Sequence, residues 1–283
     1  MKNYFILTIF LFFFNFLYAQ EWVLIEKADD VNNYMRLDRV PVSPRNEVEI
    51  YSEFTKDGAK KWQKNQKYNS LPFCEIKKYA FNDAFDSIAT RSYDCLDIEG
   101  NSLSKRFHGF LTYYHIYEWG MRATNIAHWA ELLKNYGSNA CFYASQIQYN
   151  NENAEWVKFH EDEKMERFIR VDMSNVDSLA LYKILYKKEY IKELSKEYKK
   201  VSYSRVFLRK LYVYEKKYVE LADTWFDKKS PWTTISIYPL SEKVDVESQL
   251  DSVYFDWTKL LFEQGKNVVI EKSNSLFGKN IGK

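Results

Sequence analysis

The chain has few cysteine, histidine, glycine and proline residues, and these shortages argue against several classes of function. Its 283 residues include only 3 Cys, 4 His, 8 Gly and 5 Pro. It contains no Cys-x-x-Cys or His-x-x-x-His pair, which argues against a zinc site and a dithiol redox centre. It also lacks a Gly-rich phosphate loop, a metalloprotease helix and a hydrolase elbow. The sequence therefore predicts no metal, no cofactor and no catalytic residue.

The charge is almost balanced, with 41 Lys and Arg against 39 Asp and Glu, and the two signs are interspersed. Such a chain has no overall field to attract nucleic acid, so we expect no nucleic-acid partner. The most basic stretch, residues 186–200, alternates Lys with Glu and is interrupted by Tyr. This pattern is typical of a solvated helix or hairpin face.

Residues 1–19 have the pattern of a secretory signal peptide. Lys2 precedes an apolar run from Tyr4 to Leu17, and Ala19 supplies a small residue at the cleavage site. The run is shorter than the roughly 20 residues that a membrane-spanning helix needs. We therefore expect an exported protein with no transmembrane segment after the signal peptide is removed.

One segment of the chain recurs further along the sequence. The stretch from Trp22 to Asp38 has a counterpart from Trp156 to Asp172, at a constant spacing of 134 residues (156 minus 22). Arg36 coincides with Arg170, and the intervening residues exchange Tyr for Phe, Met for Ile and Leu for Val. So long a period indicates two copies of one small domain rather than a solenoid of short repeats.

The residue patterns in each copy predict an α+β domain. Aromatic residues make up 18% of the chain and suit sheets, and Glu47 to Thr55 alternates as a half-buried strand does. A helix with one apolar face follows Asn125 and can end at Gly137, and a second helix is expected over 246–261. The fold class predicted is two tandem small domains, each an antiparallel sheet with a covering C-terminal helix. Their expected ranges are 21–149 and 155–270, with a polar linker at 150–153, a hairpin over 88–98 and 106–117, and a frayed tail after Gln264 that includes 271–283.

Both copies resemble the surface-adhesin protein E family. The resemblance is carried by Trp22, Tyr34 and Asp38 in the first copy, and by Trp156, Phe168 and Asp172 in the second. It continues in the first copy with Asp94-Cys95, then the Tyr-rich Thr112-Tyr113-Tyr114, then a second cysteine at Cys141. The second copy has Trp232 and Pro239-Leu240-Ser241 at the expected helix start, but it lacks both cysteines. The resemblance spans most of residues 21–143 and, more loosely, residues 155–262.

Membership of this family would imply a non-catalytic protein in the periplasm, at the cell surface or outside a Gram-negative bacterium. Its partner would be a protein or a cell-envelope ligand. The family pattern also implies a disulfide between Cys95 and Cys141, worth about 4 kcal/mol in the chain-entropy model. Cys74 would then be a buried thiol, with a Cys74–Cys95 bridge as the alternative. In the second copy, packing around Leu211 and Tyr254 would replace the disulfide.

Tyr113, Tyr114 and Tyr117 are the predicted binding residues, because exposed tyrosines on a sheet face or edge suit protein contacts. The recurring residues are predicted to be structural: a core tryptophan at the start of each copy and an Arg–Asp pair (Trp22, Arg36 and Asp38; Trp156, Arg170 and Asp172). Two other functions stay open from the sequence. One is a periplasmic hydrolase of unrecognised class, and the other is a structural envelope protein.

Overall fold

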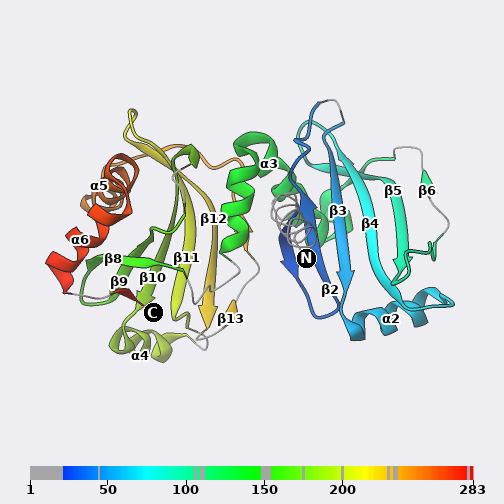
Figure 1. The fold of residues 1–283 in the computed structure, drawn as a ribbon, viewed down its shortest axis with the longest axis horizontal. Coiled ribbons are helices and arrows are strands. Elements are labelled where there is room, and N and C mark those ends of the chain that lie inside the picture. The colour runs from blue at the N-terminus through cyan, green and yellow to red at the C-terminus, as the bar shows by residue number, and fades with distance from the viewer. Residues whose placement is uncertain are drawn as a thin grey trace, which may run out of the picture. The chain divides into compact units, whose positions relative to one another are not determined.

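The computed structural model has an α+β fold with two sheet domains in tandem (Figure 1). The chain divides into two compact units, Met1–Phe142 and Tyr143–Lys283. The predicted signal peptide and the linker at 150–153 lie outside the residues that the structure describes. These are residues 22–43, 45–104, 107–108, 112–147, 154–173, 176–198, 201–227, 230–231, 235–278 and 281–282.

The first unit contains an antiparallel sheet with the strand order β1-β2-β3-β4-β5-β6, and β7 also pairs with β5. The buried and partly exposed residues of β3 alternate without a break, so one face of this sheet forms the core. The strands are β1 (Trp22–Lys27), β2 (Val31–Arg36), β3 (Glu47–Phe54), β4 (Pro72–Phe81), β5 (Ser87–Asp97), β6 (Phe107–His108) and β7 (Tyr114–His115).

The helices of the first unit lie between β3 and β4 and after β7. Helix α2 (Lys56–Gln66) begins at Thr55, whose side chain accepts a hydrogen bond from the Gly58 N–H. The 3-10 helix η1 (Ile116–Trp119) leads into α3 (Met121–Gln146). Asn125 on α3 donates a hydrogen bond to the Ile25 carbonyl of β1 at 3.4 Å, which ties the helix to the sheet.

The second unit contains a sheet with the order β13-β12-β11-β10-β9-β8-β16, and β14 and β15 also pair with β12. The long central strands are buried along most of their length. The strands are β8 (Trp156–Glu161), β9 (Met165–Arg170), β10 (Leu179–Tyr186), β11 (Ser204–Tyr212), β12 (Lys217–Asp227), β13 (Ser230–Pro231), β14 (Ser236–Ile237), β15 (Val244–Asp245) and β16 (Ile281–Gly282).

Helices cover the second sheet. The helical elements of this unit are η2 (Val176–Ser178), α4 (Lys188–Glu197), α5 (Gln249–Gln264) and α6 (Lys266–Phe277). Figure 1 shows α5 and α6 beside β8, β9 and β10. Tyr254 of α5 packs edge-on against Phe159 and Tyr182 at ring-centroid distances of 4.9 and 5.0 Å. Leu211 and Tyr254 belong to one buried apolar cluster, as predicted.

The two units share one element order. In each, three strands precede a short helix, two long strands and then short strands follow, and the closing helices come after these; in the second unit β16 follows α6. The first hairpins also share their register: Trp22 pairs with Arg36, and Trp156 pairs with Arg170. A bulge follows Leu24 in β1, and another follows Lys158 at the corresponding point of β8. The tandem arrangement of two like sheets, expected from the recurring segment, is therefore present.

The closing helices also correspond. Gly137 interrupts α3 with φ 81° and ψ 178°, and Gly265 separates α5 from α6 with φ 82° and ψ 174°. Only glycine adopts such angles without strain. Trp129 and Trp257 each lie eight residues before their glycine, and both are buried. A helix, a glycine kink and a second helical segment therefore follow each sheet in the same order.

Several sequence predictions need correction. The expected frayed tail after Gln264 is wrong for α6, which buries Val269 and Ser273. The helix end predicted at Gly137 agrees with the structure, in which a second helical segment then runs to Gln146. The partner of β5 was expected as one strand, but β6 and β7 pair with it separately. Within the described residues, no helix combines the length and the apolar character needed to cross a membrane.

Candidate functional site

The recurring tryptophan, arginine and aspartate residues form the same arrangement in both units. Arg36 Nε donates to Asp38 Oδ1 at 2.5 Å, and Arg170 Nε donates to Asp172 Oδ1 at 2.7 Å. The bond to Asp38 raises the pKa of Arg36, and the same bond lowers the pKa of Asp38. Each ion pair holds the backbone at the end of the second strand of its unit, β2 or β9. The arginine and the aspartate thereby neutralise each other's charge.

The tryptophans of these hairpins differ in burial. Trp156 is 9% exposed, whereas Trp22 is partly exposed. The Arg36 guanidinium lies 5.9 Å from the Trp22 ring centre, and Lys183 Nζ lies 5.5 Å from that of Trp156. The predicted core role therefore describes Trp156 better than Trp22. Trp232 lies outside the described residues.

All three cysteines are buried and free, so the predicted Cys95–Cys141 disulfide is absent. Cys95 lies on β5 in an apolar cluster with Phe54 and Ala59, next to α2. Cys141 lies beyond the kink in α3, where its thiol contacts the Trp129 carbonyl oxygen at 3.8 Å. Counted from the two glycine kinks, Cys141 corresponds to Val269, and both are completely buried. The position thus holds an apolar side chain in each unit.

The alternative Cys74–Cys95 bridge is also absent. Cys74 pairs with Leu96 and Cys95 with Glu75, so the two cysteines are offset by one residue on neighbouring strands. Side chains offset in this way point to opposite faces of a sheet. Burial raises the pKa of Cys95 to about 11, which keeps the thiol protonated and unreactive at neutral pH.

The predicted binding tyrosines lie on an exposed segment that we call the tyrosine strip, Tyr113 to Met121. Tyr113, Tyr114 and Tyr117 are 38%, 45% and 73% exposed, and Met121 is 90% exposed. The His115 ring stacks on Tyr117 at 5.0 Å. The segment spans β7, η1 and the start of α3, so regular backbone on both sides presents these side chains. Exposed apolar side chains this closely spaced are typical of an interaction surface.

The inner face of the first sheet carries a buried polar cluster that the sequence did not indicate. Glu75, only 2% exposed, accepts hydrogen bonds from Lys77 Nζ at 2.6 Å and Tyr93 OH at 2.7 Å. Tyr68 OH lies 3.1 Å from Tyr93 OH. Burial raises the pKa of Tyr93. The carboxylate is therefore fully engaged within the domain.

By strand register, Arg205 occupies in the second sheet the position of Glu75 in the first. Arg205 Nε donates to Asp223 Oδ2 at 2.8 Å and also contacts Glu220. Burial opposes its charge, but Glu220 and Asp223 raise its pKa. Tyr238 OH donates to Asp223 Oδ1 at 2.9 Å. The same position in the two sheets is thus the centre of a polar cluster in both units, but it is a glutamate in the first sheet and an arginine in the second.

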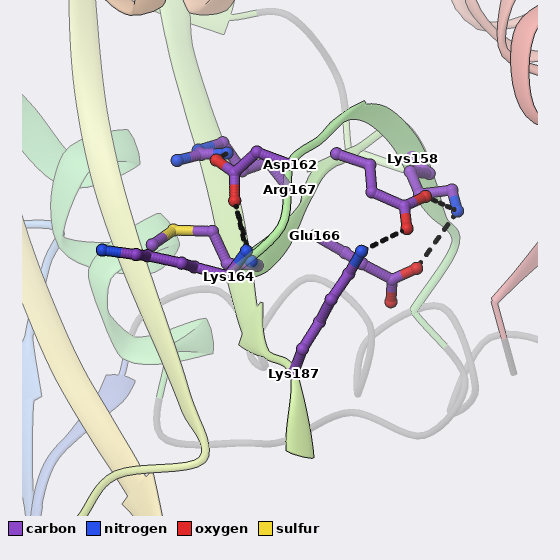
Figure 2. A network of polar contacts seen from close by, with 8 residues as sticks. Lys158, Asp162, Lys164, Glu166, Arg167 and Lys187 are labelled. Atoms are coloured by element: carbon purple, nitrogen blue, oxygen red, sulfur yellow. Dashed lines mark hydrogen bonds and ion pairs between the residues drawn. The ribbon is translucent and has the colours of Figure 1, made fainter. Parts of the chain in front are cut away.

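A further charge network ties the β8–β9 hairpin to the start of α4 (Figure 2). Lys158 Nζ, on a side chain only 8% exposed, donates to Glu161 at 2.8 Å and Glu166 at 3.1 Å. Lys187 Nζ donates to the other oxygen of Glu161 at 2.6 Å. The Ser273 hydroxyl of α6 donates to the Lys158 carbonyl oxygen at 2.6 Å. This network fastens strands and helices together.

The network also shifts two carboxyl pKa values. Hydrogen bonds from Lys158 and then Lys187 lower the pKa of Glu161 to about 2. Burial opposes ionisation of Asp162, but the Arg167 guanidinium, 2.7 Å away, and two backbone N–H groups lower its pKa to about 2. Both groups are charged acceptors at neutral pH and are poor candidates for a general acid or base.

The histidines whose side chains the structure describes belong to no candidate metal site. His115 is exposed, and burial lowers the pKa of His128 on α3 and of His160 on β8. The side chain of His108 is outside the description. In the part of the chain that the structure describes, no group of His, Cys, Asp and Glu side chains has the geometry to hold a metal ion.

The polar clusters could not be found from sequence motifs, because register brings together side chains from β4 and β5 or from β11 and β12. Comparisons of the chain with protein-family models, curated proteins and solved structures find no match. The tyrosine strip is thus the candidate site, since Tyr113, Tyr114, Tyr117 and Met121 are exposed to solvent, whereas the charged side chains of the clusters are paired within the domain.

Proposed function

We propose that this protein is an exported bacterial binding protein without catalytic activity, which contacts a protein or cell-envelope partner through the tyrosine strip. The carrying observation is the exposure of Tyr113, Tyr114, Tyr117 and Met121 within nine residues. Tyrosine offers a large contact area with little side-chain entropy to lose on binding. The resemblance to the surface-adhesin protein E family and the signal-peptide pattern support the same proposal.

The polar clusters do not favour an enzyme over this role. Glu75 and Asp223 are bound to neighbouring side chains, and the carboxyl pKa values at the β8–β9 hairpin are lowered rather than raised. A general acid at neutral pH needs a raised carboxyl pKa. Burial raises the pKa of Glu131 on α3, which is 9% exposed, but a single buried carboxyl does not by itself make a hydrolase site.

Site-specific photocrosslinking tests the proposal. A photoreactive phenylalanine analogue would replace Tyr117 in one variant and Tyr214 in the other. Tyr214 is a matched control, because it is fully exposed but lies alone in the β11–β12 turn. We expect one discrete crosslinked product on intact cells from position 117 and none from position 214. The same products at both positions, or none at 117, would contradict the proposal.

A further inference from the structure

The two sheets differ sharply on the face opposite their cores. We call this face of the first sheet the outer face. On β3 it carries Glu47, Glu49, Tyr51 and Glu53. Tyr34 pairs with Tyr51, and its counterpart Phe168 pairs with Lys183. By this register, the four β3 residues are equivalent in position to Leu179, Leu181, Lys183 and Leu185 of β10 in the second sheet.

Three acids of the first sheet therefore stand where the second sheet has leucines. Leu179 and Leu181 are each 2% exposed, whereas Glu47, Glu49 and Glu53 all retain contact with solvent. On the next strand, Lys78 corresponds to Leu208, which is completely buried. The second sheet is built to be covered on both faces. The outer face of the first sheet is built to meet water or a polar partner.

This outer face also carries a row of aromatic rings. The ring centres of Trp22 and Tyr51 are 5.9 Å apart, and those of Tyr51 and Tyr34 are 6.0 Å apart. All three side chains are partly exposed. The Tyr34 hydroxyl donates to Glu53 Oε2 at 3.4 Å, so a carboxylate lies at the Tyr34 end of the row.

The row already binds a cation at its other end. The Arg36 guanidinium lies 5.9 Å from the Trp22 ring centre, within the range of a cation–π contact. Arg36 Nη1 also reaches Glu49 at 3.3 Å, and Lys78 reaches the same carboxylate at 3.5 Å. Glu53 has no such ion pair among the described residues. Arg36 contacts an aromatic ring and a carboxylate at the Trp22 end of the row. Tyr34, Tyr51 and Glu53 provide the same two kinds of group, so a second cation could bind there.

We propose that the outer face binds a basic segment of a partner protein, with an Arg or Lys side chain lying against Tyr34 and Tyr51 and paired to Glu53. Charge complementarity selects this partner, since aromatic faces and a carboxylate attract cations and repel acidic segments. The site is separate from the tyrosine strip and does not depend on the function proposed for it.

Calorimetric titration of the purified protein with a capped Gly-Arg repeat peptide tests this site, and a Gly-Asp repeat peptide serves as the opposite-charge probe. We expect binding of the first peptide only, and weaker binding as salt is added. Glu53→Gln and Tyr51→Leu should each weaken it about three- to fivefold, the range for a partly exposed cation contact. Glu193→Gln, an exposed acid on α4, should leave it unchanged.

Circular dichroism would show whether each variant is folded. If the Tyr51→Leu protein does not fold, the conservative Glu53→Gln variant still tests the inference. Equal affinity of the Glu53→Gln and unchanged proteins, comparable binding of the Gly-Asp peptide, or no binding of the Gly-Arg peptide would each overturn the inference. Tyr117→Ser should not alter peptide affinity. Failure of this site would therefore be distinguishable from failure of the tyrosine strip.

Discussion

Replacing Gly58 with alanine should destabilise the first unit, although alanine is the better helix former. Gly58 lies in the first turn of α2, against the turn between β1 and β2. A Cβ atom at this position would lie 1.9 Å from the Asp30 carbonyl oxygen. Contacts under 3.0 Å are essentially never seen for a real Cβ, and the obstacle is backbone, so α2 and the turn must move apart.

The cost of that movement can be estimated from the contacts that join the two segments. Thr55 N donates to the Asp30 oxygen at 3.1 Å, and Thr55 Oγ1 donates to the Asp29 oxygen at 2.8 Å. Losing both bonds costs about 2 kcal/mol, and the forced repacking adds about 1–3 kcal/mol. The helix propensity of alanine returns at most about 1 kcal/mol. The expected net loss of unfolding free energy is about 2–4 kcal/mol.

Urea denaturation followed by circular dichroism measures this loss. Asn65→Ala, at an exposed position of the same helix, is the control and should be neutral or slightly stabilising. A Gly58→Ala protein as stable as the Asn65→Ala protein would refute the close approach of α2 to Asp30.

Three further predictions concern the cysteines and the charge network. Cys141→Val should change the unfolding free energy by less than about 1.5 kcal/mol, because Val269 fills the corresponding position; mass mapping without reductant should find Cys141 unpaired, and a bridge there would contradict the packing described. Lys158→Met should cost about 1–3 kcal/mol in urea denaturation, since Glu161 loses its buried partner yet keeps some solvent; an unchanged midpoint would mean that the network contributes nothing. Because the folded pKa values of Glu161 and Asp162 are depressed to about 2, their stabilisation should be complete above about pH 4.5 and fall as the pH is lowered toward 2; stability that stays flat across that window would contradict the shifts.

The sequence allowed the tandem architecture to be predicted because its strongest signals are local. Alternation in Glu47–Thr55, the recurring segment from Trp22 and the apolar stripe before Gly137 each depend on neighbouring residues. The predicted sheets, the burial of Leu211 and Tyr254 and the exposure of Tyr117 all agree with the structure.

Features that depend on tertiary context were missed. Helix α2 lies in a polar stretch, and it is held by the Thr55 cap and by the packing of Trp62 on Phe54 at 5.5 Å rather than by a broad apolar face. The Glu75 cluster forms only when strand register brings β4 and β5 together. The disulfide between Cys95 and Cys141 was expected from the family resemblance. In the structure Cys95 packs beside α2 and Cys141 lies next to Trp129, and the two thiols are not bonded to each other.

The central claim is that one sheet design occurs twice, with the same hairpin register at the start of each unit. Cross-strand NOEs in protein labelled only at Trp and Arg test it most directly, because the pairs Trp22–Arg36 and Trp156–Arg170 lie opposite each other. Three sets of backbone contacts are predicted: one from each of the two hairpins, in matching register, and one between Trp225 and Arg205 of β12 and β11. Loss of either hairpin set, or contacts of Trp22 or Trp156 with a different arginine, would contradict the duplicated design.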